Sequence, residues 1–78
     1  MSNFLPGSFF DKCTEEERKK YQRIIDEGKA GKYSNPDEAI AFINIIIEFL
    51  HKESKGAFSI AVAKWLLADA ERQKRDES

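Results

Sequence analysis

The chain has 78 residues, of which 41% are hydrophobic, and its formal net charge at pH 7 is −1. This length predicts one domain with one small core. The balance of charges disfavours the basic patch that is typical of nucleic-acid-binding modules. No stretch approaches the roughly 20 apolar residues of a membrane-spanning helix, and no basic residue precedes the apolar N-terminus as in a signal peptide, so we expect a cytoplasmic protein.

Residues 1–13 form an N-terminal aromatic arm with a turn at Pro6-Gly7. Ser8 and Asp11 have the spacing of a cap on one short helical turn. The arm contains several large apolar side chains, which we expect to pack on this chain or on a neighbouring one. They are Phe4, Leu5, Phe9 and Phe10.

Residues 14–75 are expected to form a single helical domain, followed by a charged tail over 76–78. The first helix of this domain is predicted over residues 15–27. Thr14 and Glu17 have the spacing of a capping box, and Gly28 suits a left-handed helix end. The apolar residues of this helix form only a narrow edge: Tyr21, Ile24 and Ile25.

The second helix of the domain has the strongest start signal of the chain. Asn35 is the expected N-cap, Pro36 takes the first helical position and Glu38 the third. The helix should extend to Lys52 or Ser54. Its apolar residues spread over about 220° of its circumference, whereas a surface helix needs only about 100°. It must therefore be covered on two sides. These residues are Ile40, Phe42, Ile43, Ile45, Ile46, Ile47, Phe49 and Leu50.

The third helix is predicted over residues 57–74, after a break at Lys55-Gly56. The short connection predicts an antiparallel hairpin with the preceding helix. Small residues at Ser59, Ala63 and Ala70 would let another helix approach closely. More than half of the circumference is again apolar, through Phe58, Ile60, Val62, Trp65, Leu66 and Leu67.

The expected fold is therefore all-α: a small three-helix domain with a central antiparallel helical hairpin and the aromatic arm. The single cysteine excludes a disulfide within the chain, and small cores often need a partner subunit. The surplus of apolar surface favours a homo-oligomer, preferably a dimer. The alternative is a monomer that the arm covers alone. The candidate oligomer or partner interface comprises Phe4, Phe9, Phe10, Phe42, Ile45, Phe49, Phe58, Val62, Trp65 and Leu66.

The candidate chemical groups do not form a catalytic set. Glu48 and His51 have the i, i+3 spacing of helical metal ligands, but they fall on the polar side of their helix. Cys13 is interpreted as a small apolar residue before a helix. We therefore expect no catalysis, no cofactor and no metal. Gly28 to Lys32 resembles a fragment of a phosphate-binding loop without its full spacing.

The segment from Gly31 to Ala39 is similar to the inter-helix turn of ribbon-helix-helix antitoxins, in which a Gly-basic-Tyr turn precedes a Ser-x-Glu helix start. This resemblance covers about nine residues and implies DNA reading by a strand that corresponds to residues 3–10. The same segment looks like the turn of a tetratricopeptide repeat, an array that needs several copies.

Two functional hypotheses follow. The first is a small non-catalytic helical interaction protein that binds a partner as an adaptor or inhibitor. Lys29, Lys32 and Arg72 would be anion contacts if a small ligand occupied a subunit cleft. The alternative is an antitoxin-like or other nucleic-acid-associated dimeric regulator. Its best support is the basic set on the first helix of the domain: Arg18, Lys19, Lys20 and Arg23.

Overall fold

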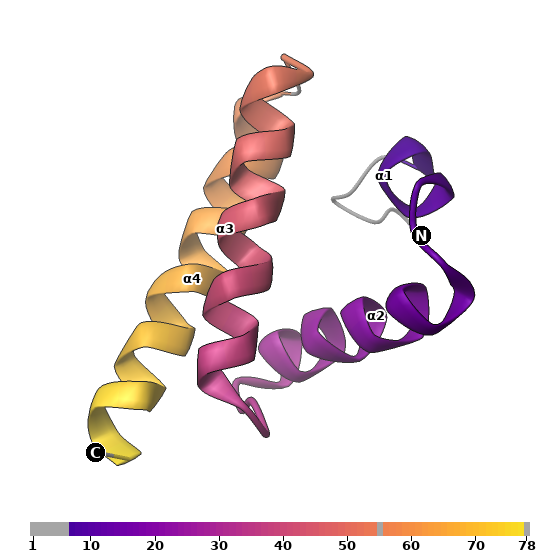
Figure 1. Ribbon diagram of the computed structural model, residues 1–78. Coiled ribbons are helices and arrows are strands. Elements are labelled where there is room, and N and C mark those ends of the chain that lie inside the picture. Colours follow the sequence, from indigo (N-terminus) through magenta and orange to yellow (C-terminus); the bar gives the residue numbers. More distant parts are fainter. Residues whose placement is uncertain (1–6, 55, 78) are drawn as a thin grey trace.

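The computed structural model describes residues 7–54 and 56–77, so the predictions for Phe4 and Leu5 lie outside it. The described chain contains four helices and no strand, which confirms the all-α class (Figure 1). They are α1 (Gly7–Asp11), α2 (Glu15–Ala30), α3 (Pro36–Lys52) and α4 (Ala57–Glu77). Two boundaries differ from the prediction, because α2 continues to Ala30 and α4 continues to Glu77.

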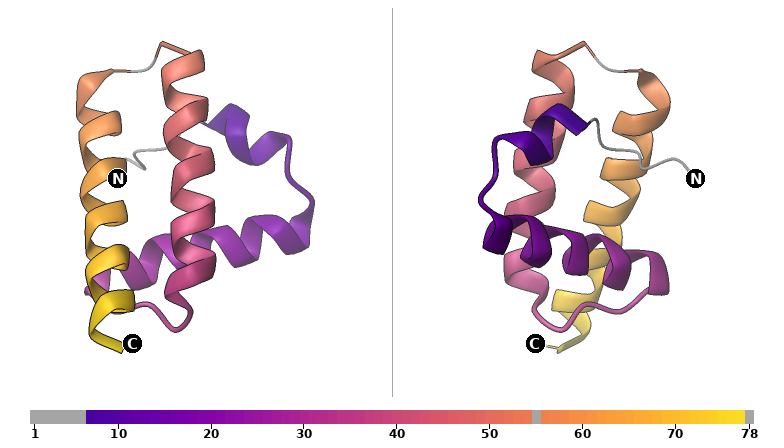
Figure 2. Two further views of the ribbon diagram at one scale, coloured as in Figure 1. Left: turned by 60° about the vertical axis from the view of Figure 1, so that its left-hand side comes forward. Right: turned by 90° about the vertical axis from the view of Figure 1, so that its right-hand side faces the viewer.

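Helices α3 and α4 lie side by side and run in opposite directions (Figures 1 and 2). Alanines allow their backbones to approach, since Ala39 on α3 and Ala63 and Ala70 on α4 are fully buried. Ile46 and Leu50 of α3 are also fully buried and belong to the same core. Of the small residues that were predicted to admit a neighbouring helix, Ala63 and Ala70 lie in the core beside α3, whereas Ser59 is only partly buried.

Helix α2 crosses the hairpin near the start of α3 and the end of α4 (Figure 2). Its capping box is present, since the Glu17 amide donates to the Thr14 hydroxyl at 3.1 Å and the Thr14 amide donates to the Glu17 carboxylate at 2.9 Å. Ile24 and Ile25 are buried in the core, as their narrow apolar edge predicted. An ion pair of 2.8 Å between Lys20 and Glu38 joins α2 to the first turn of α3.

The predicted end of α2 at Gly28 is wrong. The helix passes through Gly28 and ends at Ala30, and Gly31 is its left-handed cap with φ of +84°. Two glycines in one segment can both serve as a left-handed cap, and the sequence pattern alone favoured the earlier one. Gly28 is buried inside the helix instead, where it packs against other parts of the chain.

The start of α3 follows the prediction, with Asn35 accepting from the Glu38 amide at 3.2 Å and Pro36 at the first position. At its far end α3 finishes at Lys52. Ser54 then takes a left-handed conformation with φ of +57° on the way to α4.

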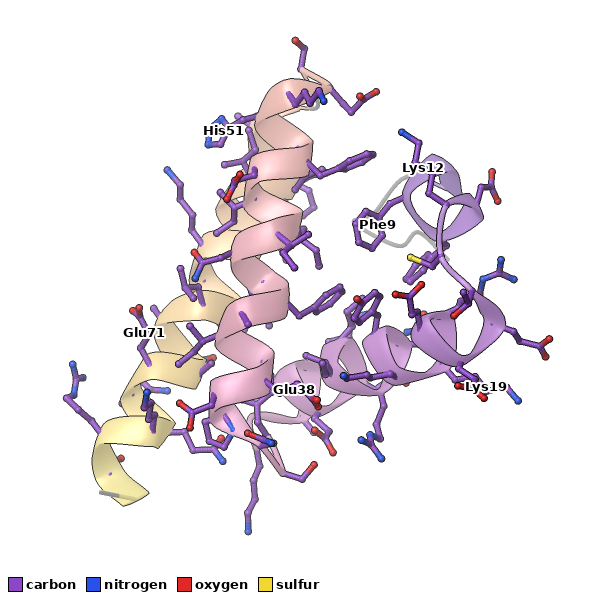
Figure 3. All side chains as sticks on the ribbon, in the orientation of Figure 1. Phe9, Lys12, Lys19, Glu38, His51 and Glu71 are labelled. Atoms are coloured by element: carbon purple, nitrogen blue, oxygen red, sulfur yellow. The ribbon has the colours of Figure 1, made fainter. Side chains whose placement is uncertain are left out.

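Helix α1 places its aromatic side chains against the rest of this chain. Phe9 is only 8% exposed, and its ring points from α1 towards α3 (Figure 3). The centroid of this ring lies 5.2 to 6.1 Å from those of Tyr21, Phe42 and Phe49. The described part of the aromatic arm therefore packs in cis.

Candidate functional site

Nine of the ten predicted interface residues lie in the described chain and separate into three groups. Phe9, Phe42 and Leu66 are buried in the core of the single chain, so they offer almost no surface to a partner. Phe10, Phe49 and Val62 are partly buried against that core. The exposed group consists of Ile45, Phe58 and Trp65, and Phe4 lies outside the described residues.

The exposed group is concentrated on α4. Phe58 is 78% exposed and Trp65 is 60% exposed. Ala61 and Ala68 are exposed as well, and spacings of three and four residues align all four along one side of a helix. We call these four residues the α4 apolar stripe. It lies opposite the buried side of α4, which carries Ala63 and Ala70.

Helix α4 therefore has two apolar sides, and the fold covers one of them. Burying a large aromatic side chain stabilises a protein by about 1.5–3 kcal/mol relative to leaving it in water. A single copy of the chain forgoes most of this free energy at Phe58 and Trp65. Their exposure is the most unusual surface feature among the described residues.

Ile45 belongs to a different surface. It is 51% exposed and lies on α3 beside the polar side of that helix, one turn from Phe49 and from Ala41. No other large hydrophobic residue of the described chain is as exposed outside α4. Ile45 thus stands alone, and isolated apolar residues are common on protein surfaces.

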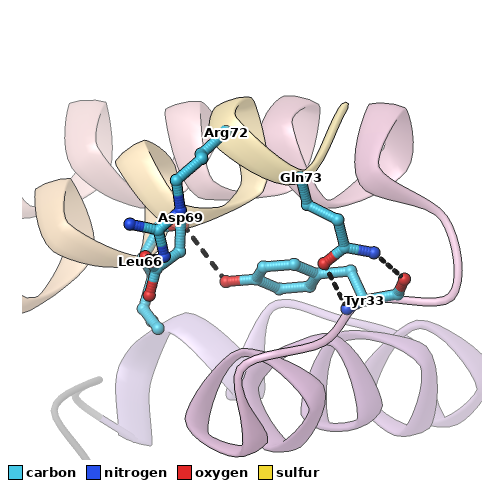
Figure 4. Close-up of polar contacts among 5 residues, drawn as sticks. All are labelled: Tyr33, Leu66, Asp69, Arg72 and Gln73. Carbon is cyan, nitrogen blue, oxygen red and sulfur yellow. Dashed lines mark hydrogen bonds and ion pairs between the residues drawn. The ribbon is translucent and has the colours of Figure 1, made fainter. Parts of the chain in front are cut away.

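Tyr33 anchors the connection between α2 and α3 to α4 (Figure 4). Its side chain is 2% exposed, and its hydroxyl donates to the Leu66 carbonyl oxygen at 3.2 Å. Gln73 also bonds the Tyr33 backbone, accepting from its amide at 2.8 Å and donating to its carbonyl oxygen. Burial, reinforced by the Asp69 and Glu27 carboxylates, raises the pKa of Tyr33 to about 12. The raised pKa keeps the phenol neutral, and the hydrogen bond to the Leu66 carbonyl oxygen holds it in position.

Gly28 provides the space for this anchor. A Cβ atom at Gly28 would lie 2.4 Å from the Tyr33 hydroxyl oxygen and 3.0 Å from a methyl carbon of Leu66. Sequence reasoning missed both roles, because it treated Gly28 as a helix end and Tyr33 as part of a turn motif. The available signal was the pair of glycines, of which only one was needed as a cap.

The predicted anion contacts are brought together in part. Lys32 and Arg72 line one open depression with Asp69, Gln73 and Asp76, whereas Lys29 does not line it. Arg72 is paired with Asp69, one helical turn before it. Two carboxylates thus accompany the two cations, so the depression has no excess positive charge for an anion.

The candidate catalytic and metal groups lie apart. Glu48 and His51 are both exposed on α3, and the described residues contain no group of three His, Cys, Asp or Glu side chains that could hold a metal ion. The Cys13 thiol donates to the Phe9 carbonyl oxygen at 3.4 Å. Burial is the main cause that raises the pKa of Cys13, so the thiolate that a nucleophile requires is disfavoured.

The basic residues of α2 do not form a separate patch. Arg18, Lys19 and Arg23 line a shallow depression that also contains Asp26. Lys19 lies 3.9 Å from Glu15, and Lys20 is engaged by Glu38. Residues 7–10, which would belong to a DNA-reading strand in the antitoxin resemblance, lie in helix α1.

Comparisons with protein-family models, curated proteins and solved structures gave no match to this chain. Within the described residues, no helix is long and apolar enough to cross a membrane. The candidate site is thus defined by the α4 apolar stripe alone.

Proposed function

We propose that this protein is a small helical interaction protein that acts by binding another protein through the α4 apolar stripe. The observation that carries the proposal is the exposure of Phe58 and Trp65 on one side of α4. Tryptophan is enriched among the residues that contribute most to binding at protein interfaces. Contiguous exposed apolar surface on a small protein marks interaction sites.

Adaptor or inhibitor action needs such a surface and no catalytic group. The mixed charges on α2 do not favour binding of nucleic acid, because Glu15 and Asp26 lie among the basic residues.

The test is photo-crosslinking in the cells that produce the protein. A photoreactive phenylalanine analogue replaces Trp65, and in a matched control it replaces Glu48, which is exposed on the polar side of α3. We expect covalent protein adducts from position 65 and none from position 48. Adding Phe58→Glu to the first variant should abolish the adducts. Equal labelling from the two positions, or no adduct from position 65, would refute the proposed function.

A further inference from the structure

We infer that the partner of the α4 apolar stripe is the same stripe on a second copy of this chain, paired antiparallel across a two-fold axis. This inference rests on the proposed function and names its partner. The spacing of the stripe and the signs of the charges beside it support this partner.

The stripe has the spacing of a coiled-coil seam. Phe58, Ala61, Trp65 and Ala68, followed by Arg72, alternate between steps of three and four residues. This pattern places five successive positions on one seam about 21 Å long. Alanines at every second position leave room for a large side chain from the opposing helix. The stripe therefore fits another helix that presents the same alternation of large and small residues.

Two exposed charges of opposite sign flank the seam on the same edge, Lys64 beside Trp65 and Glu71 beside Arg72. In an antiparallel pair of helices, equivalent edges of the two copies meet. When Trp65 packs on Ala68 of the second copy, Lys64 lies next to Glu71 of the second copy. The two-fold axis repeats this attraction, so one register creates two complementary pairs.

The alternative pairings bring like charges together. Sliding the antiparallel pair by one heptad in one direction places Lys64 beside Lys64 of the second copy, and sliding in the other direction places Glu71 beside Glu71. A parallel pair places Arg72 against Arg72 on the seam. Like charges at these positions oppose association. Charge complementarity thus selects the antiparallel register centred between Trp65 and Ala68.

We expect a seam only about 21 Å long to bury less area than the 1,200–2,000 Å² that stable complexes typically bury, and therefore a dimer that dissociates at low concentration. The experiment is sedimentation equilibrium of the full chain over a wide range of protein concentrations. We expect a concentration-dependent shift from monomer to dimer. Trp65→Glu should weaken dimerisation by roughly 30-fold or more, as removal of a central aromatic residue does. Ile45→Glu, an exposed apolar position on α3, is the matched control and should leave it unchanged.

The register is tested by charge reversal. Lys64→Glu alone and Glu71→Lys alone should each weaken the dimer by about tenfold, because both attractions become repulsions. The double variant should restore the original affinity. Both residues are exposed, and circular dichroism verifies that each variant is folded.

The outcomes separate the two proposals. A monomer at all concentrations, or a dimer that Trp65→Glu leaves intact, overturns the inference. If the losses of dimer affinity from the two charge reversals add up in the double variant, the antiparallel register is wrong. If position 65 still crosslinks to a different protein in cells, the proposed function stands while the second copy is excluded as the partner. Adducts of this chain with itself support the second copy as the partner of the stripe.

Discussion

At the scale of single residues, Gly28 is the position where the smallest change should have a large effect. Alanine in a helix interior normally adds about 1 kcal/mol of stability over glycine. At Gly28 the new Cβ would lie 2.4 Å from the Tyr33 hydroxyl oxygen, which is nearer than real contacts allow. We expect Gly28→Ala to lower the free energy of unfolding by about 1–2 kcal/mol, since overpacking outweighs helix propensity. Urea denaturation monitored by circular dichroism measures this change in the free energy of unfolding.

The Tyr33→Phe background provides the control for this prediction. Tyr33→Phe removes the oxygen atom nearest to the added methyl group. Gly28→Ala should therefore lower the free energy of unfolding less in the Tyr33→Phe variant than in the parent chain. The difference between the two costs is the coupling energy of the pair. An increase in stability on Gly28→Ala in the parent chain would show that Tyr33 moves aside freely and would contradict the anchoring role.

At the scale of elements, the docking of helix α1 depends mainly on the side chain of Phe9. Five residues are too few for a stable isolated helix, so its order rests on docking. Phe9 makes the buried ring contacts with α2 and α3, whereas Phe10 is only partly buried. We expect Phe9→Ala to release α1 and to lower the free energy of unfolding by about 3 kcal/mol, with a smaller loss for Phe10→Ala.

Cys13 reports this release directly. Its thiol bonds to the Phe9 carbonyl oxygen, and burial raises its pKa, so alkylation in the native protein should be slow. In Phe9→Ala the alkylation rate should rise towards that of an unfolded cysteine, while circular dichroism retains most of the helix signal. Unchanged alkylation would mean that α1 is held by contacts other than Phe9.

The helix starts were predictable because capping is local chemistry. Thr14 with Glu17, and Asn35 with Pro36, set the starts of α2 and α3 from a few adjacent side chains. The end of α2 was not predictable in the same way, because the role of Gly28 depends on Tyr33 folding back onto α4. Local patterns define where a helix can stop, and tertiary packing decides between two candidate stops.

At the scale of the whole molecule, the surplus of apolar surface was visible in the sequence but its location was not. Phe42 and Phe58 both follow an apolar helical periodicity. The path of α2 and α1 across α3 buries Phe42 and leaves Phe58 in water. Which aromatic residues are available to a partner therefore depends on how the elements are arranged, and a helical pattern cannot supply that information. For the same reason Leu66 lies in the core although Trp65 beside it is exposed.

The Tyr33 anchor should make the stability of the whole molecule sensitive to alkaline pH. Its pKa is raised from 10.0 to about 12, so between these values the folded chain retains a proton that the unfolded chain loses. The stabilisation is complete below pH 10 and declines as the pH rises towards 12, with about 1.4 kcal/mol lost at pH 11. Urea denaturation at a series of pH values from 9 to 11 measures this decline.

Tyr33→Phe is the control, because it removes the titrating hydroxyl and keeps the ring. At neutral pH this variant should be about 1 kcal/mol less stable, through loss of the bond to the Leu66 carbonyl oxygen. From pH 9 to pH 11 its stability should decline less than that of the parent chain, so the two curves converge. Lysine deprotonation affects both chains alike and does not produce convergence. Parallel decline of the two curves would show that the fold does not protect the Tyr33 proton, and that the connection between α2 and α3 is not anchored to α4 by a buried phenol.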